Sequence, residues 1–195
     1  MTRTKPAQQR RADLLAAGQA LFLAKGVAAT SLDDITGSAG VSKGLFYLYF
    51  RSKDDLVLAL RDQFSAEFAE RVRAAAAAEK DWAAKLDACV RVGFDYYRDL
   101  HDLHEVLFHP AAHSGPRKHQ DEGVHNQAAE VIREVLAGGV AAGVFEVEDP
   151  EATALLCYAS MHAFDAGFQG PAHLADPRLI GAAQRLFRRA AGVPE

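Results

Sequence analysis

Residues 30–56 read TSLDDITGSAGVSKGLFYLYFRSKDDL, and they predict two short helices joined by a turn. Thr30 with Asp33 has the spacing of a capping box, in which a hydroxyl and a carboxylate bind free N–H groups at a helix start. Gly40 supplies a backbone that can take a positive φ in the turn, and Ser42 can cap the second helix. The stretch therefore predicts a helix-turn-helix, whose second helix can enter a major groove.

The second helix of this motif has two distinct faces. At helical spacing, Phe46 and Phe50 share the face that points inward. The residues that point outward are Gly44, Leu45, Tyr47 and Leu48. Ser42 and Lys43 lie at the positive N-terminal end, which is a natural place for a phosphate.

The outward face predicts contacts with DNA. The tyrosine hydroxyls and the ammonium of Lys53 suit phosphate oxygens, the alternative being that the tyrosines fill the core and Lys53 is a solvated surface charge. Leu45 and Leu48 either touch thymine methyl groups or pack against the first helix. The full set of predicted DNA-binding residues is Thr30, Ser42, Lys43, Gly44, Leu45, Tyr47, Leu48, Tyr49 and Lys53.

These residues resemble the DNA-binding domain of the tetracycline-repressor (TetR) family at fixed positions. The matching positions are Thr30, Ile35, Ala39, Gly40, Val41, Ser42, Gly44, Phe46, Tyr47, Tyr49, Phe50, Ser52, Lys53 and Leu56. Thr36 departs from the alanine that is usual there, which should not disturb the fold. The resemblance is strong over about the first 55 residues, and beyond them it depends on length and helical pattern.

The resemblance implies an all-α protein with an N-terminal three-helix DNA-binding domain (residues 1–52) and a C-terminal helical bundle (residues 53–195). The bundle is expected to bind a small-molecule effector and to form a homodimer through its last two helices. Those helices, near residues 151–169 and 178–190, are rich in alanine and glycine, which also suits an intramolecular core. The implied activity is that of a repressor released from a double-stranded, near-palindromic operator.

The remaining sequence predicts helices throughout. The expected ranges are 6–25, 53–79, 82–97, 101–108, 124–138, 151–169 and 178–190. Gly26 is placed to end the first of them, whereas Asp149-Pro150 and Asp176-Pro177 are typical N-caps followed by proline. Strand signals are essentially absent.

Charge is divided unevenly along the chain. The formal total is −4, but residues 1–53 carry eight basic and three acidic residues, a net charge of +5 that leaves −9 for the rest. A basic N-terminal part concentrates the field that attracts phosphate on one domain. The sequence shows no apolar run of about 20 residues and no signal-peptide pattern, so we expect no membrane contact. Two cysteines and no disulfide framework favour the cytoplasm.

Six histidines between residues 101 and 125 raise the alternatives of a metal-responsive regulator or a metal-dependent enzyme. His104-Glu105 followed by His109 fails as a zinc-protease motif, because that motif needs histidines four residues apart. His101 with His104, and His162 with Asp165, do share helix faces. No nucleophile elbow, phosphate loop or CxxC pair is present, so the sequence predicts no catalytic residue, metal or cofactor.

Aromatic residues beside isolated polar groups predict the effector pocket. Apolar walls with a few placed polar groups are typical of small-molecule sites, and they suit a mostly apolar, drug-sized effector. The same residues could instead fill the bundle core. The predicted lining is Phe64, Phe68, His104, Phe108, Met161, His162, Asp165 and Phe168.

Overall fold

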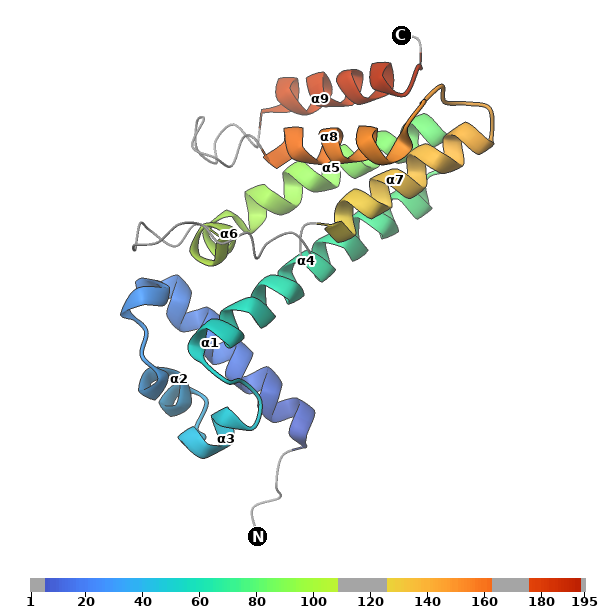
Figure 1. The fold of residues 1–195 in the computed structure, drawn as a ribbon. Helices are drawn as coiled ribbons and strands as arrows, with labels where there is room; N and C mark the ends of the chain where they lie inside the picture. Colours follow the sequence, from blue (N-terminus) through green and yellow to red (C-terminus); the bar gives the residue numbers. More distant parts are fainter. Residues whose placement is uncertain (1–5, 109–125, 163–175, 194–195) are drawn as a thin grey trace. The chain divides into compact units, whose positions relative to one another are not determined.

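The computed structural model describes residues 6–108, 126–162 and 176–193. Within these ranges every regular element is an α-helix, which confirms the predicted fold class (Figure 1). The described chain divides into two compact units. One contains the residues up to Phe64 together with α6 from Asp102, and the other contains residues 65–101 and the described residues from 126 onward.

The first unit packs around the residues that carry the helix-turn-helix. Its helices are α1 (Ala7–Ala29), α2 (Leu32–Ser38), α3 (Lys43–Tyr47), the start of α4 (Lys53–Ala78) and α6 (His101–Phe108). Its fully buried side chains include Leu14, Phe22, Ile35, Phe46 and Leu56. A Cβ at Gly18 would lie 2.6 Å from Cδ2 of Leu56, so this glycine allows α4 to pack closely on α1.

Helix α1 is a core helix of this unit. By length and composition alone it could cross a membrane, although we expected no such run from the sequence; core helices of soluble proteins and N-terminal signal sequences meet the same criteria. Leu14 and Phe22 on α1 are completely buried against the rest of the unit. Gly26 has φ 80°, which interrupts the helix where the sequence predicted its end. The physical role of α1 is therefore to support the first unit.

The second unit is built around α5. Its helices are the remainder of α4, α5 (Trp82–Asp99), α7 (Asn126–Ala141), α8 (Pro150–His162) and α9 (Pro177–Ala190). Helix α5 contacts α7, α8 and α9, and α7 also packs along α8. Two glycines of α7 make room for aromatic rings, since a Cβ at Gly138 would clash with Trp82 and one at Gly139 with Phe145. The aromatic rings of Trp82 and Phe145 can therefore pack directly on the backbone of α7.

Most predicted helix starts are confirmed. The Asp149 carboxylate accepts a bond from the N–H of Ala152 at 2.9 Å, and Asp176 accepts one from the N–H of Arg178 at 2.9 Å. Residues 163–169 of the predicted α8 lie outside the described residues. The predicted domain boundary at residues 52 and 53 coincides with the start of α4, a helix that contributes to both units. That boundary stays a prediction.

Candidate nucleic-acid interface

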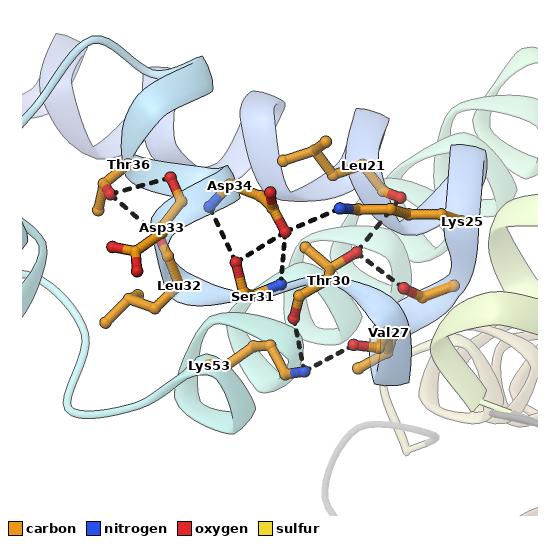
Figure 2. A network of polar contacts seen from close by, with 11 residues as sticks. Leu21, Lys25, Val27, Thr30, Ser31, Leu32, Asp33, Asp34, Thr36 and Lys53 are labelled. Carbon is orange, nitrogen blue, oxygen red and sulfur yellow. Dashed lines mark hydrogen bonds and ion pairs between the residues drawn. The ribbon is translucent and has the colours of Figure 1, made fainter.

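Helix α2 begins one residue later than the sequence indicated. Ser31, not Thr30, is the N-cap, and its hydroxyl accepts a bond from the N–H of Asp34 at 3.1 Å. The Asp34 carboxylate accepts a return bond from the N–H of Ser31 at 2.8 Å (Figure 2). The predicted box of Thr30 with Asp33 is therefore wrong by one position, because Thr-x-x-Asp and Ser-x-x-Asp occur in adjacent registers.

Thr30 has a structural role in this fold. Its side chain is 1% exposed, and its hydroxyl donates to the carbonyl of Gly26 at 2.8 Å. This bond occupies a carbonyl at the interrupted end of α1, where helical partners are missing. The burial of Thr30 argues against the direct DNA contact that the sequence suggested for its side chain.

The Asp34 carboxylate is also an electrostatic anchor for α2. The Lys25 ammonium, 2.7 Å away, and then the Ser31 N–H and hydroxyl hold the pKa of Asp34 well below its usual range. An acid whose pKa is lowered on folding stabilises the native state above its unfolded pKa of about 4 and loses that contribution as pH falls below it.

We accordingly expect Asp34→Asn to lower the melting temperature of the full chain at pH 7. The difference from the native chain should shrink as pH falls below about 4, because the unfolded native chain then binds a proton on Asp34 that the folded chain does not. Circular dichroism melts across this range measure the effect. Lys25→Met, which removes the largest cause of the lowered pKa, should reproduce part of it. A difference that stays constant with pH would show that the ionised carboxylate contributes nothing.

The turn and the start of α3 form as predicted. Gly40 has φ 65°, and the N–H of Val41 donates to the carbonyl of Thr36 at 2.9 Å. The Ser42 hydroxyl then caps α3 by accepting a bond from the N–H of Leu45 at 3.2 Å. The buried Thr36 hydroxyl donates to the carbonyl of Leu32 at 3.0 Å, so the threonine in place of alanine is accommodated.

Helix α3 presents the outward face that its sequence predicted. Phe46 and Phe50 are buried with ring centroids 5.6 Å apart, whereas Tyr47 is 56% and Leu48 77% exposed. Such exposure excludes packing of Leu48 against α1, and contact with thymine methyl groups stays a prediction. Gly44 is exposed, while Leu45 and Tyr49 are half-buried. The helix ends at Tyr47, and Leu48 is its C-cap.

Both lysines of the predicted surface have partners inside the protein. The Lys43 ammonium at the start of α3 lies 2.7 Å from the carboxylate of Asp33 on α2, and this pair is largely exposed. Asp33 also raises the pKa of Lys43. The Lys53 ammonium donates to the backbone carbonyls of Val27 and Thr30 at 2.6 and 2.8 Å. Sequence reasoning missed these contacts, because they join residues that are 10 to 26 positions apart.

Three of the predicted effector-binding residues meet in the first unit. The buried His104 ring stacks on Phe108 with centroids 4.7 Å apart, and Phe64 lies 5.6 Å from both rings. Arg61, which the sequence did not single out, donates to the carbonyl of Leu107 at 2.7 Å and lies over the Phe108 ring. The cluster thus combines aromatic walls with an imidazole and a guanidinium.

Two other predicted residues meet in the second unit. Gly93 lies between Phe68 and Met161, since a Cβ there would be 3.0 Å from the Met161 sulfur and 3.9 Å from the Phe68 ring. Phe68 also stacks on Tyr96, which the sequence analysis had not included, with centroids 5.0 Å apart. The His162 side chain, together with Asp165 and Phe168, lies outside the described residues. The structure therefore divides the predicted lining between two groups.

The alternative of a metal site has no support in the described part of the chain. Within residues 6–108, 126–162 and 176–193, no three His, Cys, Asp or Glu side chains are grouped closely enough to hold a metal ion. His109, His113, His119 and His125 lie outside these ranges. Both cysteines are buried, and burial raises the pKa of the Cys89 and Cys157 thiols to about 12, so neither is a ready thiolate ligand.

Comparison with known proteins connects both halves of the chain to one family. Residues 14–60 match the profile of bacterial regulatory proteins of the tetR family, and residues 79–165 match that of the tetracyclin repressor-like C-terminal domain. The first match contains α2, α3 and the turn between them. The second covers α5 to α8 of the described chain.

Individual relatives agree with this assignment. The transcriptional activator FasR from Mycolicibacterium smegmatis is 35% identical over 103 residues, covering 53% of this chain and 47% of FasR. The repressor KstR2 from Rhodococcus jostii is 29% identical over 145 residues, covering 69% of this chain and 65% of KstR2. The chain thus spans less than two thirds of either relative.

A solved structure has the same fold. FadR from Bacillus subtilis, in complex with stearoyl-CoA, superposes with a TM-score of 0.71 at 17% identity, covering 92% of this chain and 98% of FadR. The helix-turn-helix, the C-terminal profile and these relatives agree, and they identify a class of regulators, not of enzymes. The chain belongs to the TetR family of DNA-binding transcriptional regulators.

Proposed function

We propose that the protein is a dimeric repressor that binds a near-palindromic operator in the bacterial cytoplasm and is released by a small apolar effector. The observation that carries the proposal is the surface of α3, where Tyr47 and Leu48 are exposed on a helix held by the buried Phe46 and Phe50. Ser42, which caps α3, and Lys43 lie at the start of this helix, and their hydroxyl and ammonium groups are of the kinds that bind phosphate.

The direct test is selection of DNA by the pure full-length chain. Genomic fragments retained by the protein are sequenced, and the enriched sites are footprinted. We expect two inverted half-sites whose centres are separated by about one helical turn, 10–10.5 base pairs, or a multiple of it. Retention without an enriched sequence, or protection of one asymmetric half-site, would contradict the proposed operator binding.

Repression is tested separately, because FasR is an activator and KstR2 a repressor. A reporter promoter that contains the selected site should be silenced when the protein is expressed in the same cell. Loss of the operator sequence should restore transcription. A promoter that becomes stronger with the protein present would assign the activator role instead.

The outer faces of α8 and α9 support a dimer. Leu155 and Leu156 on α8 and Leu186 on α9 are all more than half exposed, although they are large apolar side chains. Interaction sites bury exposed apolar side chains, and these three leucines are the ones that such an interface would cover. In the two-fold arrangement that we propose, α8 and α9 of both protomers form one four-helix interface. A single α3 captures few base contacts, so two copies on one operator supply the specificity.

The aromatic side chains among the predicted effector-binding residues suit an apolar effector. Phe64, His104 and Phe108 lie together in the first unit, and Phe68 and Met161 both lie beside Gly93 in the second, so each group offers apolar side chains with few polar ones. FadR was solved with stearoyl-CoA, which combines a long acyl chain with a polar head. An effector that releases DNA must bind the DNA-incompetent arrangement better, typically by about 1–3 kcal/mol.

The probe for this part is stearoyl-CoA itself, compared with free CoA and with zinc chloride. Stearoyl-CoA should raise the melting temperature and release the selected DNA, while free CoA should do neither. Stoichiometric zinc binding that is abolished by His104→Ala would favour the metal-responsive alternative. If stearoyl-CoA has no effect on either measurement, stearoyl-CoA is excluded as the effector.

The ion pair of Lys43 with Asp33 makes a further prediction for DNA binding. Asp33→Asn removes a carboxylate that neutralises Lys43 at the start of α3, so affinity for all DNA should rise a few-fold. The dependence of log K on log salt should steepen by about 0.9 if one more phosphate is bound. Fluorescence anisotropy at several salt concentrations measures both.

The matched control is Asp62→Asn, which makes the same change of net charge at an exposed position of α4. It should leave the salt dependence unaltered. Equal effects of the two variants would mean that only net charge matters. Weaker binding by Asp33→Asn would show that Asp33 holds Lys43 in its binding position.

A further inference from the structure

The helix-turn-helix segment is flanked by two residues that contact each other. Residues 31–52 leave the end of α1, form α2, the Gly40 turn and α3, and return to the start of α4. The two ends of this segment meet at Lys53, whose ammonium donates to the carbonyl of Thr30 at 2.8 Å and to that of Val27 at 2.6 Å (Figure 2). Lys53, the residue after the segment, is therefore hydrogen-bonded to Thr30, the residue before it.

The carbonyls that Lys53 binds are suited to a cation. They follow Gly26, whose φ of 80° interrupts α1. The Val27 carbonyl also accepts a bond from the N–H of Thr30 at 3.3 Å, and carbonyls at a helix end have acceptor capacity left for a side chain. A lysine ammonium near such an end satisfies these acceptors and interacts favourably with the helix dipole. In the same stretch of residues, the buried Thr30 hydroxyl donates to the carbonyl of Gly26. Residues 26–30, at the junction of α1 and α2, are thus held in place by hydrogen bonds from the side chains of Lys53 and Thr30.

The position of Thr30 makes this contact relevant to DNA recognition. Thr30 directly precedes Ser31, the N-cap of α2, whose capping bonds fix the first turn of that helix. Helix α2 in turn leads into α3 through a turn with defined geometry at Gly40. A displacement at Thr30 would therefore be passed along the segment to the exposed Tyr47 and Leu48.

We infer that Lys53 is a positioning residue for α3, and that it acts through backbone carbonyls and not through a DNA phosphate. This inference rests on DNA binding by the family and replaces the phosphate contact that the sequence suggested. Two of the three donors of the ammonium are occupied by carbonyls. Its loss should therefore change where α3 is held more than it changes the charge presented to DNA.

The decisive variant is Lys53→Met, which keeps most of the length of the side chain but removes the ammonium. A positioning role predicts weaker binding to the selected operator, by about tenfold or about 1.4 kcal/mol. Binding to a shuffled fragment of equal length, and the salt dependence of both, should stay at native values. Non-specific affinity depends on phosphate neutralisation and not on the placement of α3 over base edges.

The competing role predicts a different pattern. If Lys53 binds a phosphate, both fragments lose affinity equally and the slope of log K against log salt falls by about one unit. Lys43→Met in the Asp33→Asn background is the matched control, since the ammonium at the start of α3 then lacks its carboxylate partner, and relative to Asp33→Asn alone it should show this second pattern. The same pattern in Lys53→Met would overturn the inference.

A second measurement needs no operator and thus separates failure of this inference from failure of the proposed function. Amide hydrogen exchange of residues 31–38 should be faster in full-length Lys53→Met than in the native chain, with α5 unchanged. Thr30→Val, which removes the hydroxyl bond to Gly26 without changing charge, should accelerate the same amides. Native exchange rates in both variants would overturn the inference, as would equal acceleration throughout the chain.

Discussion

Leu186→Glu should convert the dimer into monomers that no longer hold the full operator. The side chain is 58% exposed on α9, so in a monomer glutamate is solvated and folding should be retained. In the proposed dimer it would bury a charge against apolar neighbours, which is costly without a partner. Because the second half-site is then bound independently, affinity for the two-half-site operator should fall by about 10²–10⁴-fold.

Sedimentation velocity at micromolar concentration measures the assembly, and anisotropy on the selected operator measures its consequence. Val144→Glu is the control, since Val144 is also exposed but lies between α7 and α8. It should leave both measurements at native values, and Ala159→Glu on the outer face of α8 should resemble Leu186→Glu. A monomeric native chain, or a Leu186→Glu dimer with full affinity, would contradict the proposed interface.

Phe46→Ala is expected to have the largest effect on stability in the DNA-binding unit. The ring is completely buried and lies against Phe50 and the edge of Tyr47. Replacing a buried phenylalanine by alanine typically costs about 3–5 kcal/mol, since apolar burial is lost and a cavity remains. This is comparable with the whole stability of a small unit, and DNA binding should be lost with it.

Leu48→Ala is the matched control on the opposite face of α3. Exposed substitutions typically change stability by less than about 0.5 kcal/mol, so its urea unfolding should be near native. If Leu48 touches a thymine methyl group, its affinity for the operator should fall, and replacing the operator thymines by uracil should weaken the native protein but not the variant. Native affinity of Leu48→Ala on thymine DNA would exclude that contact, and a destabilised Leu48→Ala would contradict its exposed position.

Local interactions account for what the sequence could predict. The helix starts at Ser42, Asp149 and Asp176 depend on a side chain and an N–H group two or three residues away, and their caps are confirmed. The positive φ of Gly40 depends on one residue type in a turn. The inward direction of Phe46 and Phe50 follows from helical spacing over four residues. Each of these is decided within about one turn of chain.

Local patterns cannot choose between two adjacent residues that both fit the pattern of an N-cap. Thr30 and Ser31 both precede an aspartate by three residues, and both could cap α2 by pattern alone. Burial of Thr30 against the interrupted end of α1, with its hydroxyl on Gly26, leaves the cap to Ser31. The choice is made by packing between α1 and α2, which no local pattern contains.

The all-α class, the helix-turn-helix and its outward face are predictable from the residues, because capping, glycine conformation and helical periodicity are short-range effects. The partners of the charged residues depend on packing. An ammonium binds whichever acceptor the fold brings near, and for Lys53 these are carbonyls 23 and 26 residues earlier in the chain. The same holds for Lys43 and Asp33, which the turn between α2 and α3 brings together. Long-range proximity of this kind is a property of packing and has no signature in the residues alone.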